Sequence, residues 1–308
     1  MFLDLIDLAS GGRGAGVWRG APAPETSGRT YGGQFLAQGL AAAYQTVEPG
    51  RRVHSLHAYF VAGGDVTQPT DYTVNTVRDG RSFSLRSVSG SQGDREVFMM
   101  SASFQVPEPG LTYQPDLSLR LASGASVPNP ADTELDYNQF GYLHPDLDPD
   151  GDWSGDLRPM EIRYINPPPQ PSESAGGPLP ATNEPQLTWQ RMRSGMPAGT
   201  VDEETWMPDD PAVHDCAVAY LSDSTLIDHI LLPHGFRWQD ARLTGTSLDH
   251  AMWFYGDRTA RADQWLLCRQ SVEATGSSRG LATGRIYSAS GELVASCQQE
   301  GLMRWRFD

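Results

Sequence analysis

The chain has 308 residues, of which 39% are hydrophobic, and a formal net charge of −15 at pH 7. This length accommodates one large or two medium globular domains, and the negative charge excludes the basic footprint that nucleic-acid binding requires. All 23 basic residues are arginines, which excludes a Schiff-base lysine and a phosphate-loop lysine.

Targeting and redox signals indicate a cytoplasmic protein. No apolar run approaches the roughly 20 residues that a membrane helix needs, and Asp4 and Asp7 interrupt the first apolar residues, so we expect no secretory signal. The three cysteines, Cys216, Cys268 and Cys297, lie far apart in apolar stretches. This favours buried thiols over a disulfide or a zinc site, and we expect no metal and no cofactor.

The first half of the chain predicts one helix followed by four strands. Residues 33–47 are rich in Ala and Leu and end before Pro49-Gly50, which indicates a helix with a defined stop. Turn signals at Asp79-Gly80 and Gly93-Asp94 separate some of the runs that follow. The strand-like runs lie near residues 53–61, 70–78, 82–91 and 95–106.

The second half repeats this succession after a loop-like stretch. Residues 107–184 are rich in Pro, Gly, Asp and Ser, which is typical of a loop or linker. Residues 211–230 then predict a helix. Four strand-like runs follow near residues 242–255, 264–275, 280–288 and 293–305.

The two halves also echo each other in detail. The run Ser55-Leu-His-Ala-Tyr-Phe60 resembles residues 247–254, and Ala102-Ser-Phe-Gln105 resembles Ala295-Ser-Cys-Gln298 at almost the same offset. Two repeats of one α+β unit explain this, with each helix covering a face of an antiparallel sheet. We expect an N-terminal domain over 1–110, a linker over 111–156 and a C-terminal domain over 157–308.

The second helix places a carboxylate on an apolar face. A spacing of three or four residues puts six positions on one face of the helix: Val213, Cys216, Tyr220, Asp223, Ile227 and Ile230. Burying a carboxylate is costly unless it is hydrogen-bonded or neutralised. Asp223 is therefore either a catalytic group or a structural carboxylate that caps a neighbouring loop.

The last strand shows a similar polar exception. Alternation puts Gln299 on the face that also carries Ala295 and Cys297, at a position where the first repeat has Val106. Ser247 begins an echoed strand and carries no signal by itself. Together a carboxylate, an amide and a hydroxyl can activate and hold a water molecule without a covalent nucleophile.

These motifs resemble the acyl-CoA thioesterase II family. In the first half the matching segments are His54-Ser-Leu-His-Ala-Tyr-Phe60, Gly64-Asp65, Arg78-Asp-Gly-Arg-Ser-Phe83 and Ala102-Ser-Phe-Gln-Val-Pro-Glu-Pro-Gly110. In the second half they are Ser222-Asp223, Pro233-His-Gly235, Leu248-Asp-His-Ala-Met-Trp-Phe254 and Val294-Ala-Ser-Cys-Gln-Gln-Glu-Gly-Leu-Met-Arg304. The likeness covers about residues 15–110 and 157–304.

The resemblance implies two fused hotdog domains, each a long helix packed on a curved antiparallel sheet, with the sheets joined. It implies hydrolysis of fatty acyl-CoA by a water that Asp223, Ser247 and Gln299 orient, and a homo-oligomeric protein. Members of this family more often have Thr where this chain has Ser247. A non-catalytic acyl-CoA binder and a hotdog hydratase or dehydratase that uses Asp249-His250 remain alternatives.

Further substrate contacts are expected around the predicted helix starts and turns. Backbone N–H groups at Gly32-Gly33 or in the turn before Asp223 are candidates to stabilise an oxyanion, and Arg279 is a candidate to contact a coenzyme A phosphate. Gln34 and His57 are candidate substrate-binding residues of the first half.

Two other motifs are better explained as ordinary loops. Residues 276–280 match G-x-S-x-G, but strands on both sides favour a hairpin turn over a nucleophile elbow. The run Asp146-x-Asp148-x-Asp150-Gly151 begins like a calcium loop, yet Leu157 stands where that loop needs Glu.

Overall fold

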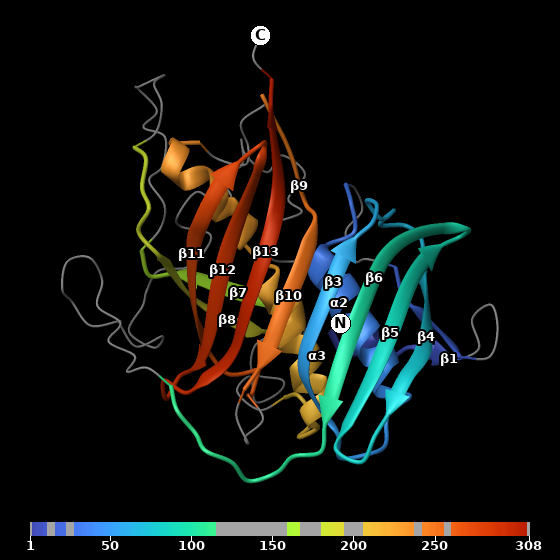
Figure 1. Ribbon diagram of the computed structural model, residues 1–308. Helices are drawn as coiled ribbons and strands as arrows, with labels where there is room; N and C mark the ends of the chain where they lie inside the picture. Colours follow the sequence, from blue (N-terminus) through green and yellow to red (C-terminus); the bar gives the residue numbers. More distant parts are fainter. Residues whose placement is uncertain are drawn as a thin grey trace.

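The computed structural model describes residues 2–10, 16–22, 28–114, 159–166, 180–193, 206–236, 242–255 and 260–306. Their strands form one antiparallel sheet that runs through both halves of the chain (Figure 1). Most of the predicted linker, including the calcium-like run that starts at Asp146, lies outside the described residues. The predicted domain boundaries remain a prediction.

The strand order is the same when it is read outward from the centre of the sheet in either direction. At the centre, β3 (Arg52–Phe60) pairs with β10 (Asp249–Phe254). Outward from β3 lie β6 (Arg95–Gln105), β5 (Phe83–Gln92), β4 (Thr70–Asp79), β2 (Val17–Gly20) and β1 (Ala9–Ser10). Outward from β10 lie β13 (Leu293–Trp305), β12 (Arg279–Ser288), β11 (Leu266–Gly276), β8 (Gln186–Met192) and β7 (Met160–Tyr164). This mirrored order is the one expected of two repeats of one unit.

Two helices lie against one face of this sheet, side by side and antiparallel. These are α2 (Gly32–Tyr44) and α3 (Pro211–Ser222) (Figure 1). Tyr44, the last residue of α2, donates a hydrogen bond to Asp215 near the start of α3 (2.6 Å). The start of α2 consequently lies at the end of α3. A short helix, α1 (Phe2–Ile6), also packs against both.

The sheet has a core face and an outer face, as the period-two pattern predicts. In β3, Leu56 and Ala58 are buried on the helix side, whereas His57 and Tyr59 are exposed on the other side. The hydrophobic core continues from the first half into the second without interruption. A residue of one half can therefore reach the interior of the other.

The second helix is shorter than predicted. α3 ends at Ser222, not near residue 230, and Asp223 is its C-cap residue. Thr225 then adopts a positive φ of 60°, a left-handed conformation that stops an α-helix. The chain resumes as the 3-10 helix η3 (Ile227–His234). The predicted apolar face of the helix extended beyond the end of α3 because Ile230, in η3, is buried in the same core as the residues of α3.

The strands of the second half also depart from the prediction. β7 lies inside the stretch predicted as loop, and β8 was missed because almost all its residues are buried, which leaves no period-two pattern. The predicted strand over 242–255 is two strands, β9 (Leu243–Ser247) and β10, with Leu248 between them.

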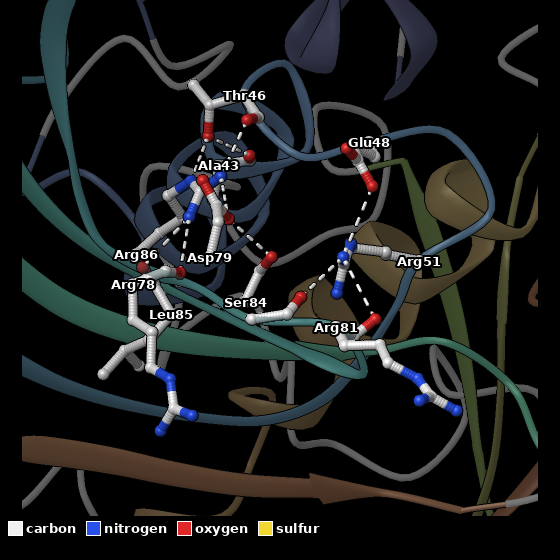
Figure 2. Close-up of polar contacts among 11 residues, drawn as sticks. Ala43, Thr46, Glu48, Arg51, Arg78, Asp79, Arg81, Ser84, Leu85 and Arg86 are labelled. Atoms are coloured by element: carbon white, nitrogen blue, oxygen red, sulfur yellow. Dashed lines mark hydrogen bonds and ion pairs between the residues drawn. The ribbon is translucent and has the colours of Figure 1, made fainter.

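A buried arginine closes the end of α2. Arg86 of β5 is 1% exposed and donates to both the carbonyl and the hydroxyl oxygen of Thr46, each at 2.8 Å (Figure 2). The same guanidinium donates to the Arg78 carbonyl and pairs with Asp79 at 2.9 Å. A cation at a helix C-terminus interacts favourably with the helix dipole, so this end of the helix pair is stabilised by charge.

Candidate active site

Asp223 lies at the end of α3, in the interior of the molecule. The helix begins with ordinary capping: Asp210 accepts a hydrogen bond from the Ala212 N–H (2.9 Å), and Pro211 occupies the first position. Asp223, at the other end, is 8% exposed. A carboxylate there faces the negative end of its own helix dipole, so the groups that stabilise it must come from other elements.

The start of α2 provides one of these groups. Its N-cap residue, Tyr31, makes no side-chain capping bond, which leaves the first N–H groups of the helix in need of partners. The Gly33 N–H donates to Oδ2 of Asp223 at 2.9 Å. The carboxylate thereby caps α2 at the positive end of its dipole. A Cβ on Gly32 would lie 2.7 Å from the same oxygen, so the close approach requires glycine.

Strand β13 provides the second group. Nε2 of Gln299 donates to Oδ1 of Asp223 at 2.5 Å, and Gln299 is completely buried. The alternation predicted for this strand holds, because Ala295, Cys297 and Gln299 are buried while Gln298 is exposed. The two polar residues that the sequence placed on apolar faces are therefore in direct contact.

Ser247 is related to this pair through strand pairing. It is the last residue of β9 and lies opposite Gly301 of β13. Directly opposed residues project to the same face of a sheet, and Gly301 is two residues beyond Gln299. Ser247 thus shares the face of Gln299, one pair along, and makes no direct hydrogen bond to Asp223 among the contacts of the described residues.

His250 and Ser222 complete the cluster, and the sequence did not assign either of them to the site. Nδ1 of His250 lies 3.9 Å from Oδ1 of Asp223, and Nε2 lies 2.9 Å from the Ser222 hydroxyl oxygen. Burial lowers the pKa of His250 to about 3, so the ring is neutral. From the sequence, His250 has a role only in the Asp249-His250 pair of the hydratase alternative. Only the packing of β10 against α3 shows that its ring faces the carboxylate.

The two predicted substrate residues of α2 both make hydrogen bonds within the protein. The N–H of Gly33 is bound to Asp223, so it is not free for a substrate oxyanion. Gln34 is 2% exposed, and its Nε2 donates to the Ala21 carbonyl at 3.1 Å. Both residues support the start of α2.

The remaining two predicted residues lie away from the cluster. His57 is exposed on the outer face of the sheet, where its ring packs edge-on against Trp253 at 5.4 Å. The sheet itself lies between this side chain and Asp223, and the predicted substrate contact of His57 remains a prediction. Arg279 begins β12 and donates to Glu300 at 2.8 Å on the surface. Its predicted phosphate contact remains a prediction.

The cluster has the composition of a proton-transfer site. It joins a buried carboxylate, a primary amide and a neutral imidazole, with a hydroxyl on the neighbouring strand. Such groups can orient a small polar molecule and take a proton from it. No group of three or more metal-ligating side chains occurs among the residues that the structure describes.

Comparisons with known proteins identify the family. A profile described as acyl-CoA thioesterase N-terminal domain matches residues 21–105, and one described as acyl-CoA thioesterase matches residues 196–302. Acyl-coenzyme A thioesterase 8 of Mus musculus is 35% identical over 288 residues, which cover 91% of this chain and 81% of that protein. The chain belongs to the acyl-CoA thioesterase family.

Bacterial proteins support the same assignment. Acyl-CoA thioesterase 2 of Haemophilus influenzae is 32% identical to this thioesterase over 280 residues, with 90% and 88% of the two chains covered. The crystal structure of an acyl-CoA thioesterase II from Mycobacterium marinum matches with a TM-score of 0.72 and 34% identity over 99% of each chain. A protein of unknown function with a hot dog fold from Alicyclobacillus acidocaldarius has the same TM-score at 19% identity.

The predicted family and the predicted fold of two joined hotdog units are therefore confirmed for this thioesterase. Within the described ranges, none of its helices combines the length and the apolar character needed to cross a bilayer.

Proposed function

We propose that this thioesterase hydrolyses medium- to long-chain fatty acyl-CoA to a free fatty acid and coenzyme A. Asp223 acts as general base toward the attacking water, and Gln299 and Ser247 orient that water. The observation that supports this most directly is the contact of the buried Asp223 carboxylate with the Gln299 amide at 2.5 Å. The cytoplasmic location and the homo-oligomeric state remain predictions.

The reaction needs only water as a second reactant. Asp223 takes one proton from the water while the water oxygen attacks the thioester carbonyl carbon. The proton passes to the sulfur of coenzyme A as the carbon–sulfur bond breaks, so the products are a carboxylic acid and a thiol. Gln299 has an amide oxygen available to accept from the water, since its Nε2 is bound to Asp223. A positioned general base contributes about 10²–10⁴-fold in rate.

The chemistry of the other side chains favours water as the nucleophile. Burial raises the pKa of the Cys216, Cys268 and Cys297 thiols, to about 12 for Cys297, so none of them supplies a thiolate near neutral pH. Ser222, with His250 and Asp223, has the residue types of a nucleophilic triad. Its side chain is nevertheless packed in the interior, 3% exposed, with Oγ 2.9 Å from the carbonyl oxygen of Ala219.

The test is turnover of an acyl-CoA series by the purified protein. Free thiol release should be observed, and kcat/KM should be highest for medium to long chains. Mass spectrometry of enzyme quenched during turnover should find no acyl adduct on any residue, including Ser222. Binding without thiol release at every chain length would refute the proposal in favour of a non-catalytic acyl-CoA protein.

The hydratase alternative loses its adjacent pair of residues. Oδ1 of Asp249 accepts the Glu300 N–H at 2.8 Å, whereas the His250 ring turns to the core face of the same strand. We therefore expect a 2-enoyl-CoA to be hydrolysed and not hydrated, which product analysis would show.

A further inference from the structure

His250 is held on the inner face of β10 at the centre of the sheet. It lies opposite Ala58 of β3, and its side chain is completely inaccessible to solvent. Its ring is neutral because burial lowers its pKa to about 3, although the nearby Gln299 amide partly opposes this effect. In a neutral imidazole one nitrogen carries a proton and donates a hydrogen bond, whereas the other accepts one. The role of the ring therefore depends on whether Nδ1 or Nε2 carries the proton.

Two buried polar atoms beside Asp223 make no hydrogen bond of ordinary geometry with any described residue. They are Nδ1 of His250 and Oε1 of Gln299. The first lies 3.9 Å from Oδ1 of Asp223, and the second belongs to the amide whose Nε2 donates to that same oxygen. Buried polar atoms of native proteins almost always have partners. A proton on Nδ1 would make this ring nitrogen a donor between two acceptors.

The opposite tautomer would leave the cluster without enough hydrogen-bond donors. If Nε2 carried the proton, the unprotonated Nδ1 would face the Asp223 carboxylate and the Gln299 carbonyl oxygen. Three buried acceptors would then lie together with no donor between them. The Ser222 hydroxyl lies 2.9 Å from Nε2, so it can donate to that nitrogen and favour the proton on Nδ1. Ser222 has a single hydroxyl proton, and the Ala219 carbonyl and the Met252 sulfur, at 2.9 and 3.1 Å, are its other acceptors. Donation to Nε2 is the arrangement that also supplies a proton beside Asp223 and Gln299.

We propose that His250 is a positioning residue of the hydrolytic site, which Ser222 holds in the Nδ1–H tautomer so that the ring donates toward Asp223 and Gln299. This inference rests on the proposed role of Asp223 as general base. The Nδ1–H fixes the Gln299 carbonyl, so the amide keeps its Nε2 on the carboxylate, and it favours the anionic form of Asp223. The ring itself contacts neither the water nor the thioester.

Two substitutions at one position separate the two ring nitrogens. In His250→Asn the side-chain amide nitrogen can occupy the place of Nδ1 and still donate toward Asp223. In His250→Gln the amide lies near the place of Nε2 and can contact only Ser222. We expect His250→Gln to lower kcat by about 10²-fold, as for a misplaced catalytic group, with KM changed less than about threefold. His250→Asn should lose less than about tenfold.

The acidic limb of the kcat/KM profile provides a second measurement. Removing a donor to a carboxylate raises its pKa, so the limb of His250→Gln should move to higher pH and that of His250→Asn should not. The other titratable group that the structure records beside Asp223 is the Cys297 thiol, whose pKa is about 12. It stays protonated across this range and cannot produce the shift.

The outcomes distinguish this inference from the proposed function. Asp223→Asn is measured in parallel. The proposed role of His250 is wrong if Asp223→Asn is inactive while His250→Gln keeps the wild-type kcat. It is also wrong if His250→Asn and His250→Gln have the same kcat and the acidic limb of the kcat/KM profile does not move. In both cases the proposed role of Asp223 stands. If Asp223→Asn is active, the proposed function itself fails.

Nitrogen-15 NMR of histidine-labelled wild-type protein tests the tautomer without any substitution. The ring that contacts the Gln299 side-chain amide should show a protonated Nδ1 and a bare Nε2, unchanged between pH 8 and pH 6. A protonated Nε2 on that ring would overturn the inference even if both variants failed to fold.

Discussion

The two long helices end in opposite ways. At the end of α2 the buried guanidinium of Arg86 binds the Thr46 carbonyl, and the positive charge suits the negative end of the helix (Figure 2). At the end of α3 the structure places the carboxylate of Asp223, a charge that its own helix disfavours. Asp223 is instead stabilised by Gly33 at the start of α2 and by Gln299 of β13.

The difference shows what each half of the chain contributes. Both halves have the same strand order and one long helix, so the architecture does not decide where the chemistry lies. One helix end follows the ordinary rules of helix capping and stabilises the fold. The other breaks them, and Gly33 of the opposite half stabilises the exception together with Gln299 of the same half. Departures of this kind are where a functional site is expected.

A large loss of activity should follow from removing the amide that supports Asp223. Gln299→Met keeps an unbranched side chain of similar length in the core but cannot donate to the carboxylate. We expect kcat to fall by about 10²-fold, with the free energy of unfolding changed by no more than about 1–2 kcal/mol. Gln298→Met, on the exposed face of the same strand, is the matched control. Equal kcat in the two variants would place the water elsewhere.

Removing the cation at the other helix end should affect stability alone. Arg86→Leu leaves the Thr46 and Arg78 carbonyls without their buried donor. We expect a loss on the order of 3 kcal/mol in urea unfolding, with kcat of the folded fraction unchanged. The same substitution at Arg78, which is exposed, should cost no more than about 0.5 kcal/mol. A large loss of kcat in Arg86→Leu would contradict the division between the two ends.

Acid should weaken the half that contains Asp223. Burial lowers the pKa of His250 to about 3 and that of His229 to about 4, from an ordinary value of 6.5. Below pH 6.5 these two histidines become protonated in the unfolded chain but stay neutral in the folded protein. Stability should therefore fall as the pH falls from 6.5 toward 4, by about 1.4 kcal/mol per pH unit for each ring. In His229→Leu the free energy of unfolding should fall less steeply as the pH falls, because one of the two rings is absent. Equal slopes in the wild-type protein and the variant would contradict this.

The smallest effect concerns Val106. The repeat aligns Val106 with Gln299, so a buried side chain is expected there. Val106 instead follows the end of β6 and is 42% exposed. Val106→Gln should change the free energy of unfolding by less than about 0.5 kcal/mol in a urea titration. A cost above about 1 kcal/mol would mean that the position is covered.

The sequence predicted those features that depend on local pattern. The alternation around Gln299 and the helical spacing around Asp223 both appear in the chain itself, and both residues are buried in contact. The end of α3 at Ser222 was missed because residues from η3 continue the apolar spacing. The approach of His250 to Asp223 joins β10 to α3 through tertiary packing, which no spacing along the chain encodes.

The most direct test of the account is kcat of Asp223→Asn beside that of Asp215→Asn. Asparagine retains an oxygen that can accept the Gly33 N–H and cap α2, so a purely structural Asp223 would tolerate it. Asp215 lies at the opposite end of the same helix, away from the cluster, and forms an ion pair with Arg52 at 2.8 Å. The account predicts that Asp223→Asn stays folded and loses about 10²–10⁴-fold in kcat, while Asp215→Asn loses stability and keeps kcat within about twofold. A loss of less than about tenfold in folded Asp223→Asn would show that the carboxylate is only a cap for α2.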